Sequence, residues 1–242
     1  MNIKHFPRGL KQPEKGFRFS VDALLLSAFI RPGQGWKILD LGCGCGVVGL
    51  GIILANPDLE LKVTGVDCDP QMIAFAEENA QNLGIKDKYQ TLLLDIKQIN
   101  HSSIEAESFD LVLLNPPYRA SRQGRISPYK EKNPARFEIS ATLNTFIQAA
   151  RFAVKNKKKV GIIYLAERLA EVMTELKTNR LTPKKMRPVY GRINKPARLC
   201  LLQAVKNGGP GLCLEPPLVL YKDEPANILT DQAKAFCPFL KK

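Results

Sequence analysis

Short apolar runs alternate with longer amphipathic stretches along most of the chain, and this alternation limits the possible folds more than any other feature. Continuous apolar runs are typical of strands that are buried on both faces. Repeated strand and helix units of this kind favour a mainly parallel sheet with helices on both faces. We expect strands at 38–41, 61–66, 91–94, 109–114, 160–165 and 199–205. We expect helices at 21–30, 47–55, 70–83, 138–154 and 167–178.

The C-terminal part departs from this pattern. Residues 199–205 and 217–221 both have the composition of strands, and a turn rich in glycine at 207–211 separates them. Two strand-like runs joined by such a turn are typical of an antiparallel pair. We therefore predict an antiparallel ribbon at one edge of the otherwise parallel sheet.

Composition excludes several protein classes. With 242 residues, 45% hydrophobic and 24% charged, the chain suits a soluble globular protein rather than a disordered or fibrous one. No stretch approaches the ~18–20 continuous apolar residues of a membrane span, and the N-terminus lacks an apolar signal core. The six cysteines are spread over a chain too large to need disulfide staples. We expect a cytoplasmic protein with no membrane partner.

The positive charge is concentrated in the second half of the chain. Residues 1–118 carry 11 basic and 14 acidic side chains, a net charge of −3, whereas 119–242 carry 25 and 9, a net charge of +16. Three basic clusters hold this excess, at 119–136, 151–159 and 177–198. Because each phosphate contact releases condensed counterions, such asymmetry favours a polyanionic partner. We expect that partner to be a nucleic acid.

A glycine-rich loop joins the first core strand to the helix that follows it, with the sequence Asp40-Leu41-Gly42-Cys43-Gly44-Cys45-Gly46. Glycines let the backbone turn tightly and approach a ligand, and a loop at this place can hold a nucleotide-like cofactor. The next two strands end near Asp67 and Asp95. Their carboxylates suit ribose hydroxyls and an adenine amino group, respectively. Cys43 and Cys45 lack the two further ligands of a zinc site, so we predict no metal.

These motifs resemble those of class I S-adenosylmethionine-dependent methyltransferases. The resemblance is carried by residues 39–46 and by Val66-Asp67-Cys68-Asp69-Pro70. It implies a Rossmann-like, seven-stranded sheet with one antiparallel edge strand, formed by residues 36–242, and an N-terminal extension and helix (1–35) packed on it. The cofactor would be S-adenosyl-L-methionine. The resemblance implies that Gly42, Gly44 and Gly46 border the methionine and ribose of the cofactor, with Asp40 near the methionine amino end. It implies that Asp67 binds the ribose and that Asp95 and Ile96 frame the adenine.

A second motif, Asn115-Pro116-Pro117-Tyr118, follows the strand at 109–114. The two prolines fix the backbone and lack amide donors, so the carbonyls there are available as acceptors. Asn115 adds a side-chain acceptor, and Tyr118 offers a flat face for stacking. Two acceptors beside an aromatic wall suit a planar group that carries an NH₂. Holding both hydrogens localises the nitrogen lone pair toward an incoming methyl group, so positioning and electrostatics replace a strong base.

This tetrapeptide resembles the motif of methyltransferases that act on adenine N6 or glutamine N5. The resemblance implies that Asn115 and the Pro116 carbonyl hold the target amino group while Tyr118 stacks on it. The flanking stretches 16–26 and 206–218 are similar to bacterial tRNA1(Val) adenine-N6 methyltransferases, which modify an adenosine beside the anticodon. That family implies tRNA as partner and N6-methylation as the reaction. In it, Asp22 helps to close the cofactor pocket, unless it is an ordinary first-turn helix carboxylate.

Basic residues near this motif are the candidates for RNA contacts. An anticodon-loop base can be splayed out, stacked on an aromatic ring and read by its edge. The loop after Tyr118 would then meet RNA phosphates, and a second basic segment would extend the track. The predicted contacts are Arg119, Arg122, Arg125, Lys184, Lys185, Arg187, Arg192, Lys195 and Arg198.

Several other functions share these motifs. The main alternative is a glutamine-N5 methyltransferase of release factors, but only ~35 residues precede the first core strand, too few for the separate N-terminal helical domain that such enzymes usually have. Guanine-N2 or DNA adenine methylation remains open, as does a non-catalytic RNA-binding protein that retains the fold. A nicotinamide dehydrogenase is disfavoured by the glycine spacing. Fold class alone does not decide among these functions.

Overall fold

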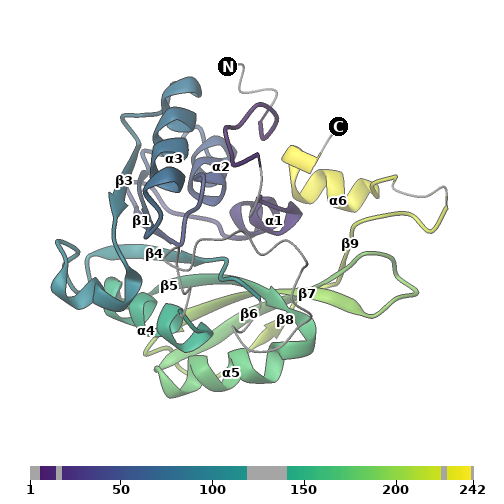
Figure 1. Cartoon of the computed structure of the whole chain (residues 1–242). Helices are drawn as coiled ribbons and strands as arrows, with labels where there is room; N and C mark the ends of the chain where they lie inside the picture. The colour runs from purple at the N-terminus through teal and green to yellow at the C-terminus, as the bar shows by residue number, and fades with distance from the viewer. Residues whose placement is uncertain (1–5, 15–17, 119–140, 225–227, 241–242) are drawn as a thin grey trace, which may run out of the picture.

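The computed structural model has one mixed sheet with helices on both of its faces (Figure 1). It describes residues 6–14, 18–118, 141–224 and 228–240. The strands lie in the order β3-β2-β1-β4-β5-β7-β6-β8, and β9 also pairs with β6. They are β1 (Lys37–Leu41), β2 (Lys62–Asp67), β3 (Tyr89–Leu93), β4 (Phe109–Leu114), β5 (Val154–Leu165), β6 (Leu181–Tyr190), β7 (Ala197–Lys206), β8 (Cys213–Leu214) and β9 (Leu218–Val219).

The helices lie where the sequence predicts them, with differences of a few residues at their ends. The α-helices are α1 (Val21–Phe29), α2 (Val47–Ala55), α3 (Pro70–Asn82), α4 (Leu143–Ala153), α5 (Leu169–Thr178) and the short α6 (Asp231–Phe236). The 3₁₀-helices are η2 (Ile96–His101), η3 (Ala166–Arg168) and η4 (Pro238–Leu240). The expected start of the helix at 138 lies outside the described residues. The sequence analysis did not predict α6.

Alternate strand residues enter two separate cores, one on each face of the sheet. In β4, Leu111 and Leu113 join the core that α1, α2 and α3 cover, whereas Val112 and Leu114 join the core covered by α4 and α5. All four side chains are fully buried. Burial on both faces explains why these strands appear in the sequence as continuous apolar runs.

Eight of the nine strands run in the same direction, which confirms the predicted, mainly parallel pattern. Among the described residues, β7 is the one strand that runs against its neighbours. It is antiparallel to both β5 and β6, whereas the other pairs of the sheet are parallel. The antiparallel strand therefore lies inside the sheet, next to β6, and not at its edge. The overall class, a Rossmann-like and mainly parallel sheet, is as expected.

The predicted ribbon of 199–205 with 217–221 is wrong. Both sides of β7 are occupied by β5 and β6, so no edge remains for the segment after the 207–211 turn. That segment contributes only β8 and β9, which pair in parallel with β6. Residues 181–190 belong to the basic cluster at 177–198, and β6 was not among the predicted strands.

The N-terminal helix α1 belongs to the packed core. Ala23, Leu24, Leu25, Leu26 and Ser27 are all buried, and Figure 1 shows α1 beside α2 on the upper face of the sheet. The approach is close, since a Cβ added at Gly51 of α2 would lie 2.8 Å from the Ser27 hydroxyl oxygen. Within the described part of the chain, none of the helices is both long and apolar enough to cross a membrane.

Candidate active site

The predicted motifs meet at one edge of the sheet because parallel strands present their carboxyl ends together. Leu41 at the end of β1 is in register with Val66 of β2 and with Leu114 at the end of β4. The glycine loop, Asp67 and the Asn-Pro-Pro-Tyr motif follow these positions directly. Ligands of open α/β sheets bind in the crevice outside such strand ends.

The glycine loop takes a shape that side chains would oppose. Gly42, Gly44 and Gly46 have φ values of +69°, +53° and +86°. The amides of Gly42 and Cys43 both donate to the carbonyl of Val66, at 2.8 and 2.9 Å, which fastens the loop to β2. A Cβ at Gly42 would lie 3.0 Å from the Phe146 ring, whereas one at Gly44 would meet open space. The loop therefore presents bare backbone toward the crevice at Gly44.

Asp67 holds the loop from the end of β2. One carboxylate oxygen accepts the amide of Gly44 at 2.9 Å, and the other accepts that of Asp69 at 3.0 Å. Burial raises the pKa of Asp67, although these backbone donors oppose the rise. Each oxygen keeps a lone pair for a further donor. An acceptor pair beside a bare backbone loop fits the ribose hydroxyls of S-adenosylmethionine.

Asp40 lies behind the loop. Its side chain is 1% exposed, and a carboxylate oxygen accepts the amide of Gly49 in α2 at 2.9 Å. Burial raises the pKa of Asp40 to about 7. Asp40 does not line the pocket described below, so its assignment to the methionine end of the cofactor stays a prediction.

Asp95 and Ile96 follow β3 at the same edge. Asp95 caps η2, since its carboxylate accepts the amide of Lys97 at 3.0 Å, and Ile96 is buried in the core below α4. Neither residue lines the pocket, and a contact with adenine stays a prediction for both.

A pocket lies between the glycine loop, the N-terminal segment and Asn115. The space between these segments, part of it open to solvent, amounts to about 420 Å³. The lining of the pocket comes from the glycine loop, from α2 and α3, from the N-terminal segment and from the residue after β4. These residues are Gly42, Cys43, Gly44, Cys45, Val47, Val48, Met72, Pro13, Phe19, Ala23 and Asn115. The pocket thus joins the cofactor loop to the Asn-Pro-Pro-Tyr motif. Pro13 and Phe19 were not among the predicted site residues, because isolated apolar residues before a helix carry no recognisable signal.

Tyr118 is fixed at three points. Its hydroxyl lies 2.8 Å from the Asp22 carboxylate and 3.3 Å from the side-chain oxygen of Asn115. Its main-chain carbonyl accepts from Arg168 at 2.9 Å, and its ring meets Tyr164 edge-on at 5.4 Å between centroids. Burial and the adjacent carboxylate of Asp22 raise the pKa of the Tyr118 phenol, which therefore keeps its proton at neutral pH.

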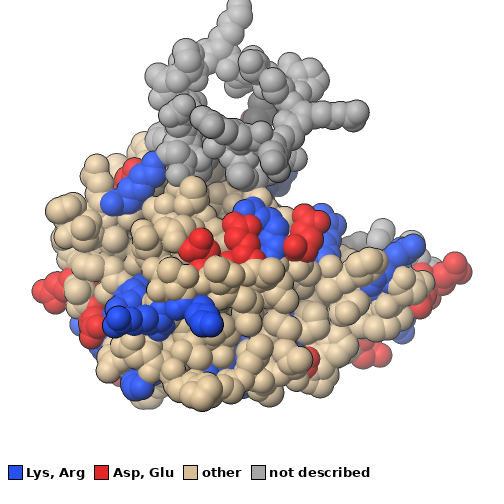
Figure 2. Space-filling model, turned by 90° about the horizontal axis from the view of Figure 1, so that it is seen from below, with Lys and Arg blue, Asp and Glu red and all other residues tan. Residues whose placement is uncertain are grey.

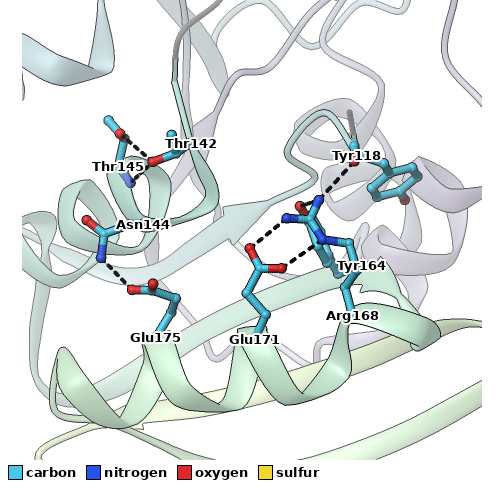
Figure 3. A network of polar contacts seen from close by, with 8 residues as sticks. All are labelled: Tyr118, Thr142, Asn144, Thr145, Tyr164, Arg168, Glu171 and Glu175. Atoms are coloured by element: carbon cyan, nitrogen blue, oxygen red, sulfur yellow. Dashed lines mark hydrogen bonds and ion pairs between the residues drawn. The ribbon is translucent and has the colours of Figure 1, made fainter. Parts of the chain in front are cut away.

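Arg168 contacts both Tyr118 and Tyr164 (Figure 3). It was not among the predicted site residues. Besides the Tyr118 carbonyl it reaches the Tyr164 hydroxyl at 2.8 Å. It also makes two hydrogen bonds with Glu171, at 2.6 and 2.8 Å. Such a bidentate pair fixes the plane of the guanidinium group. The only signal in the sequence is the Arg–Glu spacing of three residues, which is common on ordinary helices.

The predicted RNA contacts fall into separate groups. Arg192, Lys195 and Arg198 lie on or beside the turn between β6 and β7, at the edge where Leu165 ends β5. Arg198 is exposed, and its charge partly counteracts the rise in the Tyr118 pKa, which places it near the motif. The other predicted contacts that the structure describes lie along β6 and have partners within the protein. Lys184 donates to the carbonyl of Pro210, whereas Lys185 and Arg187 form ion pairs with Glu215. Arg119, Arg122 and Arg125 lie outside the described residues.

The positive excess does not cover every face. Figure 2 looks from below, onto the side where Figure 1 shows α5, and this face is mostly uncharged with basic and acidic side chains scattered over it. Among the residues of this face that the structure describes, no continuous basic band is seen.

Comparison with known proteins adds to these observations. A family model described as a methyltransferase small domain matches residues 20–130, which include the glycine loop and the Asn-Pro-Pro-Tyr motif. A tRNA1(Val) (adenine(37)-N6)-methyltransferase of Haemophilus influenzae strain PittGG is 27% identical over 213 residues, 88% of this chain and 87% of the relative. A release factor glutamine methyltransferase of Salmonella typhimurium is 31% identical over 127 residues, 52% of this chain and 42% of the relative.

The fold also matches solved structures. A predicted O-methyltransferase from Agrobacterium tumefaciens superposes with a TM-score of 0.71 at 19% identity and covers 90% of this chain and 96% of its own. At that identity the likeness concerns the fold alone. The segment that the family model matches includes the glycine loop and the carboxylate of Asp67 at the end of β2. The family match, the relatives and the fold together support a class I S-adenosylmethionine-dependent methyltransferase.

Proposed function

We propose that the protein methylates N6 of an adenosine in tRNA, in the anticodon loop of tRNA1(Val). The observation that carries this proposal is the position of Asn115, which lines the same pocket as Gly42, Gly44 and Cys45. A planar amino group held by Asn115 would therefore face a methyl group held by the glycine loop. Relatives named tRNA1(Val) adenine-N6 methyltransferases support the proposal, because they match 88% of this chain.

Methyl transfer to such an amino group needs hydrogen-bond acceptors for its two hydrogens rather than a strong base. S-adenosylmethionine supplies an electrophilic methyl group on a sulfonium. Asn115 and the Pro116 carbonyl would accept the two hydrogens of the target amino group, and the Tyr118 ring would form the wall behind it. Alignment of the nitrogen with the methyl group supplies most of the acceleration in such a site.

RNA is favoured over a protein substrate on two grounds. The release factor glutamine methyltransferase matches only about half of this chain. In addition, the half of the chain that follows Tyr118 has a net charge of +16, and Arg198 of that half lies near Tyr118. Charge of this size supports a polyanionic substrate.

Methyl transfer from labelled S-adenosylmethionine tests the proposal. The protein is incubated with bulk tRNA from a strain that lacks it and, separately, with release-factor protein, and the labelled RNA is digested to nucleosides. We expect label in N6-methyladenosine and none in the release factor. Label in the release factor alone would favour glutamine N5, and cofactor binding without transfer to either polymer would leave a binding protein that retains the fold.

The basic turn between β6 and β7 should govern the salt dependence of tRNA binding. We expect replacement of Arg192, Lys195 and Arg198 by glutamine to make the slope of log K against log salt shallower by about 2, because each lost phosphate contact accounts for roughly 0.7–0.9. Titration of fluorescent tRNA between low and physiological salt measures the slope. The matched variant replaces Lys184, Lys185 and Arg187 of β6, where Lys185 and Arg187 pair with the carboxylate of Glu215. An unchanged slope in the turn variant would remove this turn from the RNA track.

A further inference from the structure

The hydroxyl of Tyr118 lies between two acceptors. The Asp22 carboxylate oxygen is 2.8 Å away and the Asn115 side-chain oxygen is 3.3 Å away. A phenol has a single hydrogen and can donate it fully to only one of them. The nearer acceptor is also the charged one, and hydrogen bonds to a carboxylate are the stronger kind. The hydrogen therefore belongs to Asp22, and the oxygen of Asn115 stays available.

Asp22 is well placed to hold Tyr118 still. It comes from the first turn of α1, 96 residues before Tyr118 in the sequence. The five residues that follow Asp22 are buried against the core, so the carboxylate stands on a fixed helix. The opposite end of Tyr118 is fixed by Arg168 at its main-chain carbonyl (Figure 3). The ring is thus held from both ends.

The two simpler roles of Asp22 find less support. The pocket beside the glycine loop is lined by Ala23, the next residue, and not by Asp22. Asp22 therefore does not close the cofactor pocket by direct contact. A role as an ordinary first-turn helix carboxylate is also insufficient, because Asp22 accepts a hydrogen bond from the side chain of Tyr118, just after the distant strand β4.

We propose that Asp22 is a positioning residue for methyl transfer. It takes the hydroxyl hydrogen of Tyr118, which fixes the aromatic wall of the target site and keeps the Asn115 oxygen free to accept from the target amino group. The inference rests on the proposed function only in requiring a target that carries an amino group.

The proposal makes an unusual prediction for a pair of variants. In Asp22→Ala the Tyr118 hydroxyl loses its partner and turns to Asn115, where it competes with the target. We expect kcat to fall by about 10–100-fold, the range that loss of a charge-assisted hydrogen bond gives. Tyr118→Phe removes the hydroxyl together with the competition, and we expect a loss of only about 3–10-fold. The double variant should recover to the level of Tyr118→Phe, so the second substitution rescues the first.

Steady-state kinetics and calorimetric cofactor binding decide the matter. Asp22→Asn keeps a neutral acceptor and should lie between the wild type and Asp22→Ala. The control is Asp231→Asn, because Asp231 is also a first-turn aspartate, paired with Lys234 of α6. We expect unchanged kinetics for the control and unchanged cofactor affinity for all variants. A double variant less active than both single ones would overturn the proposal, as would a loss confined to cofactor affinity.

Failure of this inference is distinct from failure of the tRNA assignment. The tRNA assignment is judged on the wild type alone, by which polymer it labels. The role of Asp22 is judged on the ratios of kcat among the variants, measured with whichever polymer the wild type labels. If neither is labelled, unfolding free energies of the same four proteins still measure the coupling between Asp22 and Tyr118, and additive effects there would overturn the contact.

Discussion

Replacing Asn115 by alanine is expected to lower kcat for methyl transfer by about 10²–10³-fold, the loss that follows removal of one preorganised polar group from a reacting centre. Asn115 follows the buried strand β4 and lines the pocket that the glycine loop forms. Its side-chain oxygen is the acceptor that Asp22 leaves free. Cofactor affinity should stay within about twofold, because the main-chain hydrogen bonds of the glycine loop do not involve Asn115.

Kinetics and cofactor calorimetry on the same preparations check this result. Asn115→Asp retains an acceptor of the same size and is expected to lose less activity than Asn115→Ala. Asn144→Ala is the matched control, because Asn144 also makes a side-chain hydrogen bond, here as the donor to Glu175, but lies on α4 (Figure 3). A variant that transfers methyl groups normally but binds cofactor poorly would make Asn115 part of the cofactor wall and nothing more.

The second large effect is a dependence of stability on pH that comes from Asp40. Burial raises the pKa of Asp40 from its ordinary 3.8 to about 7 in the folded protein. Between pH 4 and pH 7 the folded state keeps a proton that the unfolded state has released. The free energy of unfolding should therefore fall as pH rises through this window, by roughly 4 kcal/mol in total at about 1.4 kcal/mol per unit. Above pH 7 this contribution no longer changes.

Asp40→Asn removes the titrating group while its side-chain oxygen still accepts the Gly49 amide. We expect the variant to be more stable than the wild type at pH 8, by roughly 2–4 kcal/mol, with the difference closing near pH 4. Chemical denaturation at several pH values measures it. A parallel decline of both proteins with pH would show that Asp40 is not the group responsible.

Asp110 provides a control of opposite sign. Burial by itself would raise the pKa of Asp110, but the amide of Lys37 and the ammonium groups of Lys155 and Lys158 bring it below the usual range. Its contribution to stability is present above the unfolded pKa and is lost as pH falls. Asp110→Asn should therefore cost stability at neutral pH and none in acid.

Most of the sheet could be predicted because its buried strands are apolar throughout. The strand β6 could not, because Pro183, Lys184, Lys185, Arg187 and Pro188 give it the composition of an exposed loop. It lies toward the edge of the sheet, with β7 along one side and only the short β8 and β9 on the other. Prolines are tolerated in such strands because one row of amides needs no partner. Missing β6 led to the wrong partner for β7.

The site was predictable where backbone chemistry dictates residue type. Gly42 and Gly46 are required by positive φ angles and close neighbours, and Asp67 follows from its place after β2. The hydrogen bonds of Tyr118 to Asp22 and Arg168 depend on how distant elements pack, and spacing in one sequence contains no trace of that packing. The pocket wall from Pro13 and Phe19 was hidden for the same reason.

The anchoring of Tyr118 from both directions of the chain links activity to complete folding. A nascent chain that has released residues up to the end of β4 already holds the whole glycine loop and Asp22, yet Arg168 is 50 residues further on. Such an intermediate has the parts to bind cofactor before it has a firm wall for the target. A chain cut just after Tyr118 would keep the Asp22 contact of this residue and lose the Arg168 contact, so segments on both sides of it in the sequence are needed to support its ring.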